Sequence, residues 1–287
     1  MVHSAFVRSQ LARMGVHADR VEILREKDGV IVARVHDGVH SCVFKGFVHS
    51  DFRREITHYC MLAALGMPTL RMLAYTDASL LLEDVEASEQ WRLGVEADMD
   101  DPDVAAALAA WYRRLHAAGY DYVARHGEGL YDENDVITCE NLAAIRQRTD
   151  TAHLRAWAVI DENMDALLAR IHAARRTLTY NDFYYTNLVV ARDGGAAMMF
   201  DYNLLGKGYA YADVRNVCSS LSARAGEAFL QAYGGIDTQE KRIDQVASVL
   251  TTLHFACRRA EMPDWAQESL VCLHGDLAQR VERLLSD

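Results

Sequence analysis

The segment Thr179–Asp201, TYNDFYYTNLVVARDGGAAMMFD, constrains this chain more than any other. Two apolar runs of strand length, Leu188–Ala191 and Ala197–Phe200, flank the turn-forming sequence Asp-Gly-Gly. This arrangement predicts a β-hairpin. Folding at that turn brings Asn187 and Asp201 side by side at the open end of the hairpin.

Oxygen-bearing side chains gather at this open end. Asp182 lies five residues before Asn187, in a polar and aromatic loop. A hard cation such as Mg²⁺ takes oxygen ligands, usually one or two from protein together with phosphate oxygens and water. A further carboxylate nearby accepts a proton from a hydroxyl that attacks a phosphate. The segment therefore predicts Asn187 and Asp201 as metal ligands and Asp182 as a catalytic base. The alternative is a turn at Asn181 and an ordinary strand-end charge at Asp201.

The order Asp182, Asn187, Asp201 resembles the catalytic loop and metal-binding Asp of the protein-kinase-like fold. The closer resemblance is to the aminoglycoside phosphotransferase and choline kinase family of small-molecule kinases. That family reads H-G-D-x-x-x-x-N, a hairpin, and a hydrophobic run ending in Asp, followed by a Gly and a further Asp. Gly208 and Asp213 follow Asp201 by seven and twelve residues, as the pattern requires. The family's later Asp anchors the catalytic loop, so the resemblance implies a structural role for Asp213.

Three positions depart from the family pattern. Tyr180 replaces the usual His, which helps to hold the loop in the family. Asn181 replaces the usual Gly, and Asn is among the few residues that tolerate a left-handed backbone. Asn203 stands where the family commonly has an acid. None of these changes removes a group that touches phosphate or metal. With Tyr180 in place of the His, however, the sequence does not indicate which group supports the loop.

The resemblance also implies a nucleotide site. Lys45 would reach the α- and β-phosphates, and Glu55 in the following helix would pair with it, with Asp51 as the fallback partner. Glu83 and Val85 belong to a segment similar to the family's interlobe hinge, where adenine binds backbone groups. The alternatives are a solvated strand lysine and an ordinary acid on a helix surface.

Other features of the sequence leave alternatives open. The turn Lys27–Gly29 either covers phosphates or is a plain hairpin, and no G-x-G-x-x-G is present. His116, at the end of a helix, is interpreted as structural. Trp265 and its acidic neighbours are candidates for closing a substrate pocket. Aromatic side chains near the reaction centre either bind a cationic group or pack the core: Phe183, Tyr184, Tyr185, Tyr202, Tyr209 and Tyr211.

The periodicity predicts a β-rich first part and a helical second part. A helix is predicted over Asp51–Leu65, with Ser50 as its N-cap and Gly66 as its stop. Strands are predicted at Val21–Arg25, Val30–His36, Val39–Phe47, Leu70–Thr76 and Ser79–Val85, and later helices at Asp103–Ala118 and Thr151–Arg175. We therefore expect an α+β, two-lobed, protein-kinase-like fold. Residues 1–84 would form an N-terminal nucleotide-binding lobe, and residues 85–287 would form a catalytic and substrate-binding lobe.

Composition excludes several classes of protein. A net charge of −11 argues against a nucleic-acid partner, because a basic stripe is needed to release counterions, and it permits a cationic substrate. No apolar run approaches the length of a membrane span, and the N-terminus predicts a short amphipathic helix rather than a signal peptide. Six scattered cysteines are typical of a reduced, cytoplasmic protein.

Together these features predict an ATP- or GTP-dependent, Mg²⁺-dependent kinase that phosphorylates a hydroxyl of a small molecule. The acceptor would be of the aminoglycoside, choline or other amino-alcohol, or sugar type. A nucleotide-binding pseudokinase or regulatory protein is the alternative. A protein kinase is disfavoured, because only eleven residues separate Asp201 from Asp213 and no A-P-E follows. The sequence carries no prediction of the oligomeric state.

Overall fold

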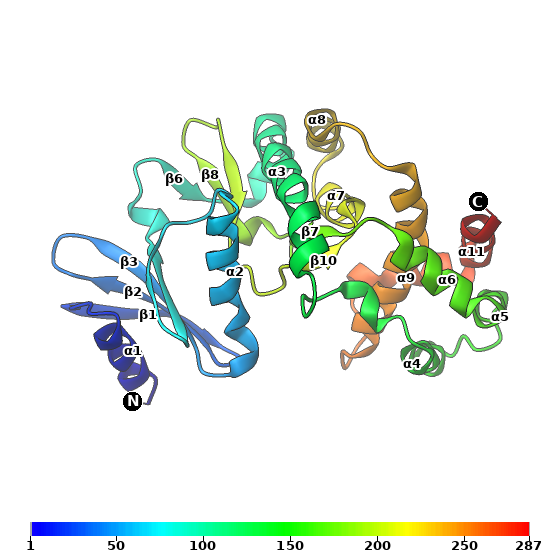
Figure 1. Ribbon diagram of the computed structural model, residues 1–287, viewed down its shortest axis with the longest axis horizontal. Helices are drawn as coiled ribbons and strands as arrows, with labels where there is room; N and C mark the ends of the chain where they lie inside the picture. The colour runs from blue at the N-terminus through cyan, green and yellow to red at the C-terminus, as the bar shows by residue number, and fades with distance from the viewer. Residues whose placement is uncertain (1, 287) are drawn as a thin grey trace. The chain divides into compact units, whose positions relative to one another are not determined.

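The computed structural model describes residues 2–286 (Figure 1). The chain divides into two compact units. The first comprises Met1–Leu115, Asp182–Leu205 and Val217–Tyr233. The second comprises His116–Asn181, Gly206–Asn216 and Gly234–Asp287. The predicted lobes, divided at residue 84, are defined by their roles in nucleotide binding and catalysis. That division stays a prediction.

An antiparallel sheet dominates the first unit, with strands in the order β1-β2-β3-β5-β4. The strands are β1 (Arg20–Lys27), β2 (Val30–His36), β3 (Ser41–Phe47), β4 (Met72–Tyr75) and β5 (Ser79–Glu83). A two-residue turn joins β1 to β2, with Asp28 at φ 51° and Gly29 at φ 79°, as hairpins of this length require. A Cβ on Gly29 would lie 2.2 Å from the His49 ring, so only glycine fits there. The strands predicted from the sequence are confirmed.

The two faces of this sheet have different surroundings, because side chains alternate along a strand. One face packs against α1 (Val2–Arg13), which confirms the predicted N-terminal helix. The cluster contains Val7, Leu11, Ile31, Ala33, Val35, Phe44 and Leu81. The opposite face carries Val30, Val32 and Lys45 and lines a cavity.

The helix after β3 begins later than predicted. A 3₁₀ turn, Ser50–Phe52, precedes α2 (Arg54–Ala64), and Arg53 is the N-cap. Ser50 is therefore not the N-cap, and that prediction is wrong. The physical reason is that the Ser50 hydroxyl donates to Asp51 Oδ1 at 3.2 Å instead of accepting from a helix amide. Gly66, at φ 67°, ends the helix as predicted.

The predicted hairpin is confirmed. It pairs β8 (Leu188–Ala191) with β9 (Ala197–Met199), with Leu188 opposite Met199. The Phe200 amide donates to the Asn187 carbonyl at 2.9 Å, which extends the pairing to the open end. The other edge of β8 pairs with β6 (Trp91–Leu93), a short strand that the sequence did not predict.

The second unit is mainly helical. Its apolar core includes Trp157, Ile160, Ile171, Leu250, Leu253 and Val281. The continuous helix predicted over Thr151–Arg175 is wrong, because Asn163, at φ −125° and ψ 18°, separates α5 from α6. The α-helices that lie wholly in this unit are α4 (Cys139–Thr149), α5 (Arg155–Glu162), α6 (Met164–Ala173), α9 (Thr238–Cys257), α10 (Gln267–His274) and α11 (Leu277–Ser286).

A short strand pair in the second unit leads into the catalytic loop. β7 (Thr177–Thr179) pairs with β10 (Gly206–Gly208), and α7 (Ala210–Cys218) follows β10. α3 (Pro102–His126), longer than predicted, approaches β7 closely. A Cβ on Gly119 would lie 2.4 Å from the Leu178 amide nitrogen, so glycine permits this approach. α8 (Ala223–Tyr233) belongs to the first unit.

The predicted α+β class is confirmed by a β-rich N-terminal part and a helical C-terminal part. Within residues 2–286, every helix is too short or too polar to cross a membrane.

Candidate active site

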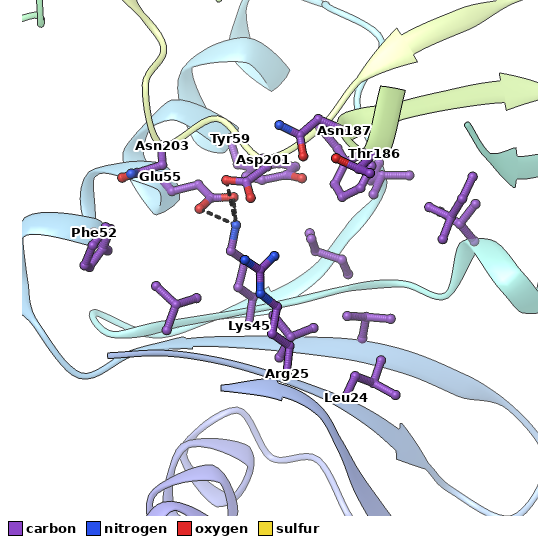
Figure 2. A pocket seen from close by; sticks show the side chains of 18 of the residues that line it. Leu24, Arg25, Lys45, Phe52, Glu55, Tyr59, Thr186, Asn187, Asp201 and Asn203 are labelled. Atoms are coloured by element: carbon purple, nitrogen blue, oxygen red, sulfur yellow. Dashed lines mark hydrogen bonds and ion pairs between the residues drawn. The ribbon is translucent and has the colours of Figure 1, made fainter. Parts of the chain in front are cut away.

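A cavity of about 560 Å³ lies within the first unit, between the sheet, α2 and the hairpin (Figure 2). Its volume is in the range of small-molecule sites. The side chains that line it come from β1, β2, β3, β5, α2 and the loops around β8 and β9. All seven residues proposed from the sequence line it: Lys45, Glu55, Glu83, Val85, Asp182, Asn187 and Asp201.

Lys45 on β3 is the centre of an ion-pair network. Its Nζ lies 2.7 Å from Glu55 Oε2 and 2.8 Å from Asp201 Oδ1 (Figure 2). The Lys45 side chain is 12% exposed and that of Glu55 is 0% exposed, so the lysine is in the buried setting that its apolar neighbours predict. Asp51, the fallback partner, does not line the cavity. The contact with Asp201 was not foreseen from the sequence.

Burial and charge oppose one another in this network. Burial raises the pKa of Glu55 to about 7, and the Lys45 ammonium only partly offsets this effect. Burial alone would lower the pKa of Lys45, but the charges of Glu55 and Asp201 outweigh it, and the net pKa is raised. Lys45 is therefore an ammonium at neutral pH, because a nearby opposite charge favours the charged form.

Asp182 and Asn187 lie together at the hairpin's open end. Asn187 Nδ2 donates to the Asp182 carbonyl and to Asp182 Oδ2, each at 3.2 Å. Both bonds use the amide nitrogen, so the amide oxygen is the atom available to a metal ion. Burial raises the pKa of Asp182 to about 6, helped by the charge of Asp201 and opposed by the Asn187 bond. A carboxylate with this pKa is a better proton acceptor near neutral pH than an ordinary Asp.

Two residues of this region have a left-handed backbone. Asn181 has φ 65° and Asp201 has φ 63°. The prediction that Asn181 tolerates this conformation in place of glycine is confirmed. The same conformation at Asp201, just after the end of β9, was not predicted. Asn and Asp adopt it at lower cost than other residues that bear a Cβ.

Asp213, in the second unit, anchors the strand end that precedes Asp182 in the chain. Its Oδ2 accepts from the Tyr180 amide at 2.8 Å, and its Oδ1 accepts from the Asn181 amide at 3.0 Å. His116 Nε2 lies 3.1 Å from Asp213 Oδ2, and both side chains are buried. The loop is thus held through backbone amides, which any residue other than proline supplies at position 180. This geometry gives His116 a structural contact, but His116 lies within α3 and not at a helix end, so that part of the prediction is wrong.

A second network fixes the end of β5. Arg34 Nε donates to Asp84 Oδ2 at 2.7 Å, and the Ser41 hydroxyl donates to the same oxygen at 2.7 Å. Asp84 also accepts from the Glu86 amide at 3.2 Å, which caps the turn that begins at Val85. Sequence reasoning missed this network. The sequence signal that could have revealed it is the alternation of side chains along β2, which puts Arg34 on the same face as Val30 and Val32.

The donor set fits Mg²⁺ only together with phosphate. Within residues 2–286, no group of three or more His, Cys, Asp and Glu side chains is arranged to hold a metal ion. Asn187 and Asp201 offer two oxygen ligands, and Mg²⁺ typically combines one or two protein ligands with water and substrate phosphates. The residues therefore fit a metal that arrives with a nucleotide. The six cysteines, all within the described part of the chain, are free thiols.

The aromatic residues near the loop differ in burial. Phe183, Tyr202 and Tyr209 are buried and belong to the core, whereas Tyr184 and Tyr185 are exposed. Tyr211 is partly buried and packs against the core of the second unit. The exposed Tyr184 and Tyr185 are therefore the better candidates for contact with a cationic ligand.

Comparison with solved structures gives many similar folds, and the three described here have low sequence identity to this chain. A macrolide 2'-phosphotransferase from Brachybacterium faecium has 18% identity, covers 94% of this chain and 97% of its own, and has a TM-score of 0.61. A choline kinase from Streptococcus pneumoniae has 12% identity, covers 100% and 99%, and has a TM-score of 0.63. The AMP-bound complex of a spectinomycin phosphotransferase has 10% identity, covers 97% and 98%, and has a TM-score of 0.58.

These likenesses confirm the kinase-like fold expected from the catalytic-loop motif. A search of curated protein sequences gives no match. The family model described as the phosphotransferase enzyme family, APH, matches residues 14–244. Because this match covers most of the sequence and includes every proposed site residue, the chain belongs to the aminoglycoside phosphotransferase family of phosphotransferases.

Proposed function

We propose that this protein transfers the γ-phosphoryl group of ATP to a hydroxyl of a small molecule. The observation that carries the proposal is the meeting of Lys45, Glu55 and Asp201 with Asp182 and Asn187 around one cavity. Membership of a phosphotransferase family supports the reaction class. The AMP bound to a spectinomycin phosphotransferase of similar fold supports the choice of nucleotide.

Each residue has a proposed role in binding or proton transfer. Asp182 orients the acceptor hydroxyl and takes its proton, as a carboxylate with a pKa of about 6 is suited to do. Lys45 binds the α- and β-phosphates, and Glu55 positions the lysine by its ion pair. Backbone groups at Glu83 and Val85 bind adenine. Catalysis of this kind consists mainly of positioning and of charge stabilisation.

Asn187 and Asp201 would hold Mg²⁺. The ion supplies neutralisation of the charge that develops on the phosphate oxygens. The proposed lobes follow from these roles: Lys45, Glu55 and Glu83 lie in residues 1–84, Val85 is the first residue of the second lobe, and the base and metal ligands come later in that lobe. The free cysteines support a cytoplasmic location.

The proposed acceptor is an aminoglycoside, choline or another amino-alcohol, or a sugar. The macrolide phosphotransferase and choline kinase of similar fold support a small hydroxyl compound. The test is release of ADP from Mg-ATP in the presence of a panel of such compounds, with Asp182→Asn measured in parallel. Acceptor-dependent release that the variant lacks is the expected result. Release that is equal in the variant would remove the assigned base, and tight ATP binding without transfer to any acceptor would favour the pseudokinase alternative.

A further inference from the structure

β1 contains an extra residue that its partner strand lacks. Glu22 pairs with Arg34 and Ile23 pairs with Ala33, but the next residue in register is Arg25, which pairs with Val32. Leu24 is therefore the extra residue of a β-bulge. Because side chains alternate between faces, a shift of one residue moves every later side chain of the strand to the opposite face.

The bulge changes which charges face the cavity. After it, Arg25 pairs with Val32 and Lys27 pairs with Val30, and all four residues line the cavity. Regular pairing would instead turn Arg25 and Lys27 to the other face and put Glu26 opposite Val30. The bulge thus places a guanidinium and an ammonium on the cavity face and removes a carboxylate from it.

Register across the sheet places Arg25 in the same row as the phosphate-binding lysine. Val32 pairs with Arg25 on one side and with Lys45 on the other. With strands about 4.8 Å apart, the Cα atoms of Arg25 and Lys45 are about 10 Å apart. Two side chains of this length can reach the same ligand from that separation. Figure 2 shows both side chains pointing into the cavity. Arg34, in contrast, lies in the neighbouring row with Val43, beside the end of β5.

Arg25 also differs from the other cavity cations in its partners. Lys45 is paired with two carboxylates, and Arg34 is paired with Asp84 and Glu86. Lys27, at the end of the strand, lies 3.9 Å from Asp28. Among residues 2–286, the exposed Arg25 side chain makes no hydrogen bond or ion pair. Its charge is therefore the one most available to an anionic ligand in this row.

We infer that Arg25 binds the terminal phosphates of the nucleotide and supplies the contact that a glycine-rich loop would otherwise provide. The inference rests on the proposed function. No G-x-G-x-x-G is present in the β1–β2 turn, so a side chain from the bulged strand takes that position. A guanidinium suits this role because its planar donors bind two phosphate oxygens at once.

The test compares nucleotides that differ only in phosphate, by titration calorimetry of the full chain with Mg-ATP, Mg-ADP and adenosine. Arg25→Ala should weaken ATP binding about tenfold or more, which is the loss of one charged hydrogen-bonded contact. Adenosine affinity should not change, and Arg25→Lys should recover part of the loss. Arg20→Ala is the matched control, since Arg20 is on the same strand, pairs with Glu22 and does not line the cavity.

The outcomes separate this inference from the proposed function. Wild-type protein that binds ATP, with Arg25→Ala binding it equally well, would overturn the role of Arg25 and leave the proposed function intact. An equal loss of ATP and adenosine affinity would also overturn it, because the arginine would then support the sheet rather than bind phosphate. Wild-type protein that binds no ATP would overturn the proposed function itself.

Discussion

The ammonium of Lys45 lies 2.8 Å from Asp201 Oδ1, so the proposed phosphate ligand and the proposed metal ligand neutralise one another. Binding of a metal nucleotide would exchange this pair for two new ones, lysine with phosphate and aspartate with metal. If phosphate drew Lys45 away without a metal ion, Asp201 would lose its partner in a partly buried site, which is costly, whereas Lys45 would keep Glu55 as a partner in either case. We therefore expect metal and phosphate to bind cooperatively.

The first prediction concerns Asp201→Ala. ATP should raise the Tm of the wild type more with Mg²⁺ than without it, because a ligand that binds the native state stabilises that state. The variant should lose the Mg²⁺-dependent part of this increase. Thermal unfolding with ATP, in the presence and absence of Mg²⁺, measures the Tm increase of the wild type and of the variant. Asp193→Asn, in the exposed turn of the same hairpin, is the control. An equal Mg²⁺-dependent shift in Asp201→Ala would mean that Asp201 is not a metal ligand.

The second prediction is that Asp182→Asn slows transfer about 100- to 10,000-fold, the usual contribution of general-base catalysis. Asn preserves the shape of the side chain and its proximity to Asn187 but cannot take a proton. ATP affinity should remain near the wild-type value. Single-turnover transfer and calorimetry measure the two effects separately. Transfer at the wild-type rate would exclude Asp182 as the base.

The third prediction concerns pH. Because the base must be ionised and the pKa of Asp182 is raised from 3.8 to about 6, kcat/KM for the acceptor should fall as the pH drops below about 6. The raised pKa also means that the folded state binds the proton more tightly than the unfolded state. The resulting stabilisation is present below pH 3.8 and is lost as the pH rises through about 6.

Asp182→Asn removes this titration. Its stability relative to the wild type should therefore increase between about pH 4 and pH 7. Urea unfolding of both proteins across this range is the measurement. A constant difference, or an acidic limb of kcat/KM near pH 4, would show that the pKa of Asp182 is not raised.

The parts of the site that sequence predicts are those encoded by local pattern. Two apolar runs around Asp-Gly-Gly indicate the hairpin, and the hairpin alone brings Asn187 near Asp201. The pairing of Lys45 with Glu55 also follows from motif order, although the second partner of Lys45 does not. Its contact with Asp201 depends on the left-handed backbone at position 201.

Features that depend on register or tertiary packing escape prediction. Arg25 reaches the cavity only because of the bulge at Leu24, and regular alternation assigns it to the wrong face. Serine is a residue type favoured at N-caps, but at Ser50 a 3₁₀ turn comes before α2. The three-residue strand β6 forms because β8 offers an edge to it, and three residues carry too little periodicity to predict a strand.

The fourth prediction concerns Asp213→Asn. An amide places an NH₂ group where one carboxylate oxygen accepts a backbone amide, so at least one buried bond at Tyr180 or Asn181 is lost. Hydrogen bonds to a buried charged group suggest a cost of about 2 to 4 kcal/mol in unfolding free energy. Transfer should slow as well, because the loop before Asp182 loses its anchor.

Urea unfolding and kcat, measured together, test this role. Asp165→Asn, at an exposed position in the first turn of α6, is the control and should have little effect. Unchanged stability and turnover in Asp213→Asn would remove the proposed anchor.

The last prediction is that the preferred acceptor is cationic or polyhydroxylated rather than anionic. The chain has a net charge of −11, and three acids, Glu261, Asp264 and Glu268, lie near the exposed Trp265 in the sequence. Two cations near the metal ligands in sequence would favour the opposite result, but each already has a partner. Lys207 donates to the Gly127 carbonyl at 3.0 Å, and Arg215 donates to Asp244 at 2.9 Å.

An acidic surface raises the local concentration of cations and speeds their capture, and salt weakens this effect. The measurement is kcat/KM for a matched amino-alcohol and sugar acid at two ionic strengths. The amino-alcohol should be preferred, and its kcat/KM should fall as salt is added, while that of an uncharged sugar should stay constant. Preference for the acid would contradict the prediction, as would capture of the cation that is insensitive to salt.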